Sequence, residues 1–390
     1  MNSEWQKSLL GNFVEINPRE TIVKGHIAKK IGMDKLQPFC RDILEYEFSE
    51  FNGGSKFRNG DTIMARITPC LENGKIAKVN ILDKNEVGFG STEYIVFRAK
   101  CGITIPDYVY YLVCSNFVRE PAIKSMVGSS GRQRVQTDVI SNIEIDLPSL
   151  SEQKKISSIL SAIDDKIELN NKINNNLEQQ AQAIFANEFL LSESLPKGWI
   201  QGSLIDIADY LNGLAMQRYR PTANETGIPV LKIKELRQGC CDDNSELCSP
   251  NIKKDYVIHD GDVIFSWSGS LLVDFWCGGT CGLNQHLFKV TSSQYDKWFY
   301  YAWTKHHLDR FIAVAADKAT TMGHIKRDEL EKAEVLIPNE ADYNRIGGLL
   351  QPIYNLIIAN RIENKKLAQT RDTLLPKLMS GELDVSDIDI

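Results

Sequence analysis

No run of apolar residues in this sequence approaches the ~20 residues that a membrane-spanning helix requires. The first residues, MNSEWQKSLLGNF, also lack the basic segment followed by an apolar segment that marks a secretory signal peptide. Both absences predict a cytoplasmic protein. The 390 residues, 43% of them hydrophobic and 25% charged, are enough for two or three domains with sizeable cores.

Motifs of the common catalytic and nucleotide-binding sites are missing too. There is no GxxxxGK[ST] phosphate loop, because the Gly-Lys pair at Gly74 and Lys75 lacks the upstream glycine. There is no GxSxG or HExxH motif and no NPPY- or DPPY-like tetrapeptide, and the six histidines show no metal-binding spacing. We therefore expect no catalytic residue, no bound metal and no cofactor in this chain.

Cysteine pairs with the CxxC spacing of zinc sites are not found among the nine cysteines. An odd number of cysteines in a cytosolic protein also argues against a disulfide framework. Cys277 and Cys281, together with Cys240, Cys241 and Cys248, could form a zinc site, but free thiols are the default interpretation.

A surplus of positive charge is likewise missing, because the formal net charge is −6. This argues against a generally basic nucleic-acid binder, although the relevant quantity is the charge on one face. Any contact with DNA is therefore expected to be local, or shared with a more basic partner.

What the chain does contain is a long internal repeat. The stretch Pro148–Phe189 aligns without a gap with the stretch that begins at Pro338, at a constant offset of 190 residues. In both copies, apolar residues and asparagines recur at alternating steps of four and three, which is the seam of a heptad repeat. The seam positions are Ile156, Leu160, Ile163, Ile167, Asn170, Asn174 and Leu177, and then Ile346, Leu350, Ile353, Ile357, Asn360, Asn364 and Leu367.

Each copy predicts a long helix, and the partner for its seam is the other copy. Ser149 followed by Glu152, and Asn339 followed by Asp342, are capping patterns at the two expected starts. If the helices pair as an antiparallel coiled coil about a pseudo-twofold, Asn170 faces Asn364 and Asn174 faces Asn360. Such asparagines fix register; the alternative is that the seam ends in a solvated stretch.

The repeat predicts an α+β chain with the order globule, helix, globule, helix. Strands are expected in FRNGDTIMARI, NGKIAKVNIL and EYIVFRAK, a helix in DYVYYLVCSNFVREPAIKSM, and an N-terminal helix or turn at residues 5–16. The two globules match in the order of their segments but not in their residues. This suggests one repeated framework that presents two domains with different targets. The predicted segments are a globular domain at 1–147, a helix at 148–190, a linker at 191–198, a globular domain at 199–337, a helix at 338–380 and a tail at 381–390.

The strongest candidate for ligand contact is the loop VGSSGRQRV. No acidic residue occurs from Pro121 to Thr137, and Gly128 and Gly131 would let the backbone approach a phosphate closely. Arginine can also read guanine with two hydrogen bonds. The alternative is a solvated loop with exposed arginines. The candidates in this segment are Lys124, Ser129, Ser130, Arg132 and Arg134.

The second globule carries a counterpart of this loop, ATTMGHIKRDEL, with candidates Thr320, Thr321, His324 and Lys326. Secondary candidates are Arg66, Lys75, Arg218, Arg220 and Trp267, although a core position is the alternative for Trp267.

In the order of its parts the chain resembles the specificity subunit of type I restriction-modification enzymes. The resemblance rests on LPSLSEQKKISSILSAIDDKIELN (147–170), LPKGW (195–199), GSSGRQRV (128–135) and LLPKLMSGEL (374–383), and it covers nearly the whole chain. The second helix departs from the pattern, since it opens with NEADYNRI, and the second loop has Met-Gly-His where the first has Arg-Gln-Arg.

This resemblance implies two target-recognition domains, each reading one half of a bipartite site in double-stranded DNA. It implies that the helix pair sets the spacing and docks two modification subunits, which would hold S-adenosylmethionine. Restriction subunits would add ATP- and Mg-dependent cleavage, and this chain would be non-catalytic. Two alternatives are a single-chain nuclease or methyltransferase and a coiled-coil adaptor that binds no DNA.

Overall fold

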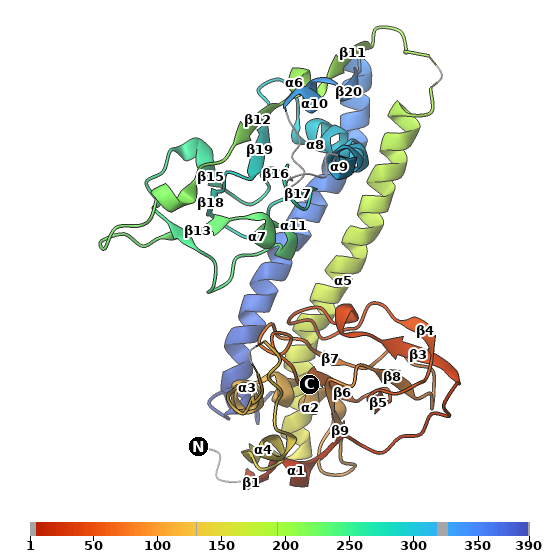
Figure 1. Ribbon diagram of the computed structural model, residues 1–390, viewed down its shortest axis with the longest axis vertical. Coiled ribbons are helices and arrows are strands. Elements are labelled where there is room, and N and C mark those ends of the chain that lie inside the picture. The colour runs from red at the N-terminus through yellow and green to blue at the C-terminus, as the bar shows by residue number, and fades with distance from the viewer. Residues whose placement is uncertain (1–4, 130, 193, 318–326, 389–390) are drawn as a thin grey trace. The chain divides into compact units, whose positions relative to one another are not determined.

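The computed structural model describes residues 5–129, 131–192, 194–317 and 327–388. Backbone contacts divide the chain into two compact units (Figure 1). Unit 1 comprises Met1–Glu168 and Leu367–Ile390, and unit 2 comprises Leu169–Lys366. Each unit therefore combines one globular segment with a part of both long helices, whereas the sequence-based division kept globules and helices as separate segments.

Unit 1 contains two four-stranded sheets and one two-stranded sheet in its described residues, with the orders β2-β9-β6-β7, β4-β3-β8-β5 and β1-β10. The first sheet is antiparallel, and the second contains a parallel pair, β3 with β8. The strands are β1 (Gln6–Leu9), β2 (Val14–Ile16), β3 (Ile27–Ile31), β4 (Glu47–Glu50), β5 (Lys56–Phe57), β6 (Thr62–Ala65), β7 (Ile76–Lys78), β8 (Gly88–Gly90), β9 (Tyr94–Ala99) and β10 (Glu144–Leu147).

The helices of unit 1 cover the first sheet. The residues from Tyr108 to Val113 are all buried, because their helix, α2 (Pro106–Cys114), packs against both the sheet and the long helices. The core includes Ile156 and Leu160 of one long helix and Leu378 of the other. The short helices are α1 (Leu10–Phe13), α2 (Pro106–Cys114), α3 (Asn116–Lys124), α4 (Thr137–Ser141) and the 3-10 turn η1 (Met33–Lys35).

Unit 2 repeats this arrangement of sheets in its described residues, with the orders β12-β19-β16-β17, β14-β13-β18-β15 and β11-β20. The parallel pair recurs as β13 with β18. The strands are β11 (Ile200–Ser203), β12 (Asp209–Asn212), β13 (Ile228–Leu231), β14 (Leu247–Cys248), β15 (Val257–Ile258), β16 (Val263–Ser266), β17 (Leu272–Phe275), β18 (Cys281–Leu283), β19 (Leu287–Thr291) and β20 (Glu334–Ile337).

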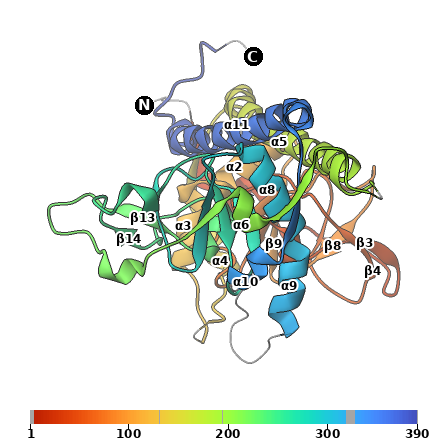
Figure 2. The same ribbon diagram turned by 90° about the horizontal axis from the view of Figure 1, so that it is seen from above.

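Aromatic side chains dominate the core of unit 2. The rings of Trp298 and Tyr301 lie 5.1 Å from those of Tyr343 and Tyr354, respectively. The helix α8 (Lys297–His306) therefore packs closely on the long helix α11 (Glu340–Met379) (Figures 1 and 2). The short helices are α6 (Leu204–Ile207), α7 (Ile233–Gln238), α8 (Lys297–His306), α9 (Leu308–Asp317), α10 (Arg327–Glu331) and the 3-10 turns η2 (Met216–Arg218) and η3 (Lys254–Tyr256).

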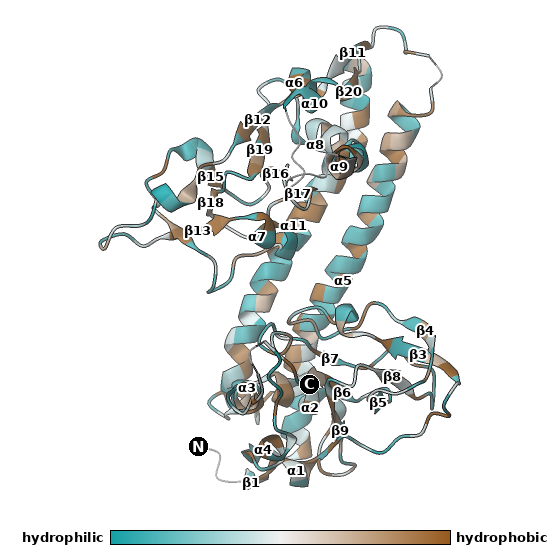
Figure 3. Cartoon of the chain, viewed as in Figure 1, coloured by the Kyte–Doolittle hydropathy of each residue, from teal (hydrophilic) through white to brown (hydrophobic). Residues whose placement is uncertain are grey.

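The two long helices are α5 (Leu150–Phe189) and α11 (Glu340–Met379), each of 40 residues. Apolar and polar stretches alternate along both of them (Figure 3). Arg345 of α11 contacts Glu188 near the end of α5, and Asn360 contacts Asn174, so the helices run antiparallel within unit 2. None of the described helices is long and apolar enough to cross a membrane.

Both expected capping patterns are present. The backbone N–H of Glu152 donates to Oγ of Ser149 at 3.3 Å, and that of Asp342 donates to Oδ1 of Asn339 at 3.0 Å. In each unit a tryptophan then fixes the same helix turn. The indole N–H of Trp5 donates to Glu152 at 3.1 Å, and that of Trp199 donates to Asp342 at 2.9 Å.

The structure corrects two details of the sequence-based expectation. Residues 5–16 form strand, helix and strand rather than one helix or turn, because β1 pairs with the closing strand β10. The helix expected at residues 107–126 is two helices, because Ser115 between them adopts an extended conformation and its hydroxyl donates to the carbonyl of Leu112.

Candidate nucleic-acid interface

The loop 128–133 of unit 1 is held at its base by backbone hydrogen bonds. The N–H of Val127 donates to the carbonyl of Arg134 at 3.0 Å, and the N–H of Arg134 donates back at 2.9 Å. Thr68 binds the carbonyl of Gln133 through both its N–H and its hydroxyl. These hydrogen bonds form a short ladder at the base of the loop.

Gly128 is required by this geometry. Its φ is +142°, and an added Cβ would lie 2.9 Å from the carbonyl oxygen of Arg132. The tip itself is exposed at Ser129 and Arg132, and the guanidinium of Arg132 forms no hydrogen bond or ion pair with another described residue. Arg132 is therefore available for an anionic ligand.

Arg134, at the end of the loop, is paired with a carboxylate. Its Nε lies 3.0 Å and 2.9 Å from the two oxygens of Glu93, and its Nη2 lies 2.7 Å from Oε1. This guanidinium lowers the pKa of the Glu93 carboxyl, so the pair is fully charged at neutral pH. One edge of the Arg134 guanidinium is therefore engaged within the chain.

The remaining candidates of unit 1 are placed differently from one another. Arg66 lies two residues before Thr68, which binds the base of the loop, and Nη2 of Arg66 donates to the carbonyl of Val135 at 3.2 Å. Lys75 donates to the carbonyl of Met33 at 2.7 Å and is half-buried, which suits a structural role. Lys124 is exposed and pairs with Glu120 one helical turn away on α3. Ser130 lies outside the described residues.

The second loop cannot be compared side chain by side chain, because Thr320, Thr321, His324 and Lys326 lie outside the described residues. The sheets β2-β9-β6-β7 and β12-β19-β16-β17 of the two units can be compared. Strand pairing matches Ala65 with Tyr94 in unit 1 and Ser266 with Leu287 in unit 2. The turns that follow β6 and precede β9 therefore correspond to those that follow β16 and precede β19.

At these corresponding turns the two units carry different chemistry. Trp267 takes the position of Arg66, and His286 takes the position of Glu93. Trp267 donates to Oδ1 of Asn212 at 3.1 Å, and Nδ1 of His286 lies 3.2 Å from the hydroxyl of Ser268. Unit 2 thus replaces an ion-paired surface by an aromatic and hydrogen-bonding one.

The sequence analysis did not single out Glu93, Asn212, Ser268 or His286. Glu93 follows Ser-Thr, and His286 follows Asn-Gln, directly before the strand sequences YIVFRA and LFKVT. Polar residues at such turns were a usable signal in unit 1, since the Glu93 carboxylate there is bonded to Arg134 of the loop. Arg218 lies apart from this group on η2, where it is exposed.

The helix seam is occupied by the residues that the repeat predicts. Nδ2 of Asn170 donates to Oδ1 of Asn364 at 2.8 Å, and Nδ2 of Asn360 donates to Oδ1 of Asn174 at 2.9 Å. This is the pairing expected from the pseudo-twofold. Ile156, Leu160, Ile346, Leu350 and Ile357 are buried, and they belong to the globular cores rather than to a helix-helix seam alone. Half-buried seam residues are Ile163, Ile167, Leu177, Ile353, Asn364 and Leu367.

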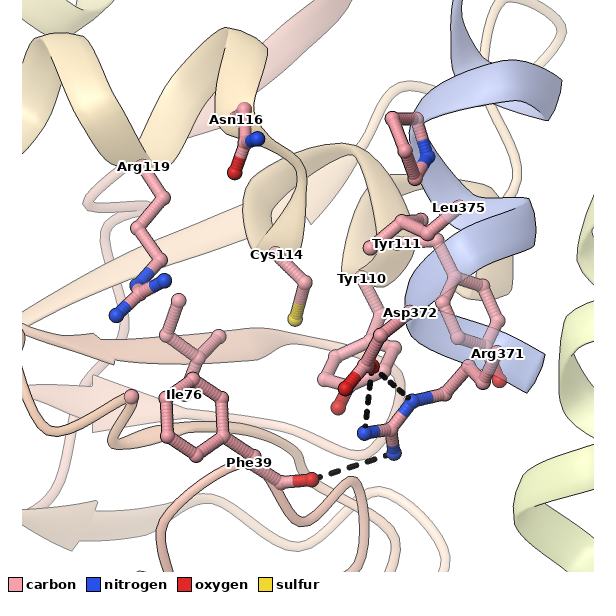
Figure 4. A pocket seen from close by; sticks show the side chains of 12 residues that line it. Phe39, Ile76, Tyr110, Tyr111, Cys114, Asn116, Arg119, Arg371, Asp372 and Leu375 are labelled. Carbon is pink, nitrogen blue, oxygen red and sulfur yellow. Dashed lines mark hydrogen bonds and ion pairs between the residues drawn. The ribbon is translucent and has the colours of Figure 1, made fainter. Parts of the chain in front are cut away.

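A cavity of about 250 Å³ lies in unit 1 between α2, α3, Phe39 and the last turns of α11 (Figure 4). Arg371 donates to the carbonyl of Phe39 at 3.3 Å, and the guanidinium of Arg119 lies 5.1 Å from the ring centroid of Phe39. Burial raises the pKa of Cys114 to about 12, so this thiol stays protonated. The cavity shares no lining residue with the loop, and we regard it as part of the packing of α11.

Each of the nine cysteines, all of which are described, is a free thiol. Within the described ranges no group of three or more His, Cys, Asp or Glu side chains is placed to hold a metal ion. Burial raises the pKa of Cys277 to about 11.

Comparison with known proteins bears on the whole chain. The family model described as the type I restriction modification DNA specificity domain matches it twice, at residues 2–179 and 196–369. The MjaIX specificity subunit of Methanocaldococcus jannaschii is 29% identical over 309 residues, which are 73% of this chain and 70% of that protein. The HindI specificity subunit of Haemophilus influenzae is 21% identical over 404 residues, covering 84% and 87% of the two chains.

Among solved structures, the S subunit of a type I restriction-modification system from M. genitalium shares the fold. The TM-score is 0.56 at 14% identity, and the match covers 97% of this chain and 96% of that one.

Proposed function

The chain belongs to the type I restriction-modification DNA specificity family, and from this premise we propose that its two globular domains read the two halves of one bipartite DNA site. As a specificity subunit it has two DNA-recognition domains and no catalytic role of its own. Subunits of this kind act together with DNA and with modification and restriction subunits.

A comparison of the two units supports the proposal that they recognise different half-sites. Both units have the same strand orders and the same tryptophan-to-carboxylate bond at the start of a long helix. Yet the turns that follow β6 and precede β9 hold Arg66 and Glu93 in unit 1, whereas the corresponding turns of unit 2 hold Trp267 and His286. A common frame with exchanged side chains is what two readers of different sequences require.

We further propose that α5 and α11 dock two modification subunits and set the distance between the half-sites. S-adenosylmethionine would then be held by the modification subunits, and ATP and Mg by restriction subunits. From Ile156 to Ile184 the predicted helix rises ~42 Å at ~1.5 Å per residue, which exceeds the ~34–36 Å of one DNA turn. We therefore expect half-site centres separated by about one helical turn or slightly more.

A footprint of the full chain with its modification partner tests this proposal. We expect two protected patches on one DNA, and methyl transfer from labelled S-adenosylmethionine only when the partner is present. Methyl transfer by the purified chain alone would establish the single-chain enzyme instead. A complex that protects no DNA would establish the coiled-coil adaptor, and the modification partner without this chain serves as the control.

A further inference from the structure

Glu93 holds one edge of the Arg134 guanidinium and leaves the other edge open. Nε and Nη2 of Arg134 are bonded to the carboxylate at 2.7–3.0 Å, whereas Nη1 has no bond to another described residue. The side chain of Arg134 is 46% exposed, and that of Glu93 is 23% exposed. A planar fork with one edge fixed and one edge free is suited to a second bidentate contact.

The backbone beneath this pair is fixed as well. Arg134 is bridged to Val127 on one side and to Ile67 on the other. The carbonyl of Glu93 accepts a hydrogen bond from the N–H of Arg66 at 2.9 Å, which extends the β6–β9 pairing by one residue. Both ends of the Arg134 side chain are therefore held before any ligand binds.

We propose that Glu93 is a positioning residue that orients Arg134 to read a guanine in the half-site bound by unit 1. This inference rests on the proposed DNA-reading function. Guanine presents two acceptors, O6 and N7, in the major groove, and an arginine fork matches both of them. Ordering the arginine in advance reduces the side-chain entropy lost on binding.

If Arg134 contacted a phosphate, the position of Glu93 beside it would have no explanation. A carboxylate beside a phosphate-binding arginine repels the phosphate and weakens the contact. Beside a base edge the same carboxylate costs less, because base edges are neutral. Arg132, which has no carboxylate partner among the described residues, is the better candidate for a phosphate contact.

Unit 2 offers an internal comparison. His286 stands where Glu93 stands, and its hydrogen-bond partners among the described residues are Ser268 and Gln285. We therefore expect substitutions of Glu93 to change only one half of the recognised sequence.

The test compares E93Q, E93A, R134A, R134K and the double variant E93A/R134A, each as full chain with the modification partner. Methylation-sensitive sequencing first defines the wild-type motif. Methylation rates are then measured on the cognate DNA and on DNA with a single base pair changed. We expect E93A and R134A to reduce discrimination at the same guanine by about tenfold or more, which is the range for one bidentate base contact.

Three results support positioning over other roles. E93A should have no further effect in the R134A background, and R134K should keep affinity for non-cognate DNA while losing the preference for guanine, because lysine has no fork. The matched control E120Q, which removes a carboxylate from the exposed Glu120–Lys124 pair of the same unit, should leave the motif unchanged.

Several results would overturn the inference. Full discrimination in E93Q and E93A would make the ion pair merely structural. An effect of E93A that persists in R134A would mean that Glu93 reads a base itself. Changes in both half-sites, or at a base other than guanine, would also refute it. A wild-type complex without a bipartite motif would instead refute the proposed function.

Discussion

Asp164 of α5 is one of the buried charged residues of unit 1. Its carboxylate accepts hydrogen bonds from the hydroxyl of Tyr111 at 2.6 Å and from Nη1 of Arg371 at 2.8 Å, and its side chain is only 5% exposed. Removing one partner of a buried ion pair leaves the other charge without compensation, which costs more than the pair itself contributes. Asp164 therefore links α2, α5 and α11 within this unit.

We predict that D164N lowers the stability of unit 1 by about 3 kcal/mol. Hydrogen exchange followed by mass spectrometry would show faster exchange of amides in α2 and in the first half of α5. The matched control is D165N, since the adjacent Asp165 pairs with Arg41 but is 66% exposed and should cost less than about 1 kcal/mol. Equal effects of the two substitutions would contradict the central role of Asp164.

Most contacts between individual side chains could not be predicted from the sequence. The loop residues Arg132 and Arg134 follow from composition, but the clamp on Arg134 depends on Glu93, 41 positions earlier. Such a contact is fixed by strand order and register, which sequence periodicity does not specify. The bonds from Trp5 and Trp199 to the long helices were not predicted from the sequence.

At the scale of elements, the long helices were the most predictable part of the chain. Heptad spacing and capping residues depend on neighbours within one or two turns, and the repeat supplied the partner. The strands β3, β4 and β8 were not predicted, because they are short and their sheet closes through distant pairing. Ser115 shows the same limit, since it divides α2 from α3 within one apolar pattern.

The paired asparagines allow a prediction on the helix pair itself. Asn174 and Asn360 are both buried and bonded to each other, so N174L should leave the amide of Asn360 without its partner. We expect N174L to lower the free energy of unfolding by about 1–3 kcal/mol. The double variant N174L/N360L should recover most of that loss, because an apolar pair then fills the seam.

Chemical denaturation of both variants would measure these changes, and sedimentation would report the oligomeric state. Asparagine in a seam selects one register and one partner at a cost in stability. We therefore expect the double variant, unlike the native chain, to form mixed oligomers. A double variant less stable than N174L would contradict the pairing.

For the whole molecule, the net charge of −6 sets how it can hold DNA. The long-range field of the isolated chain opposes a polyanion, so binding must come from local basic groups and from partner subunits. The charge and the repeat were readable from sequence, and they anticipated two readers on one frame. The sequence did not predict the division into two units that each include parts of both helices. This division depends on contacts such as that of Ile156 with the globular core.

Removing one positive charge from each unit in turn distinguishes the DNA contacts of the two units. In complex with the modification partner, R132A should lower the slope of log K against log salt by about one unit, because one phosphate contact is lost. Protection should weaken only in the half-site of unit 1. R218A removes the same charge from an exposed position in unit 2, so any loss it causes should fall in the other half-site. Filter binding at several salt concentrations measures the slopes, and footprints assign the half-sites. Loss of both half-sites to the same extent in R132A would mean that the two units do not read DNA separately.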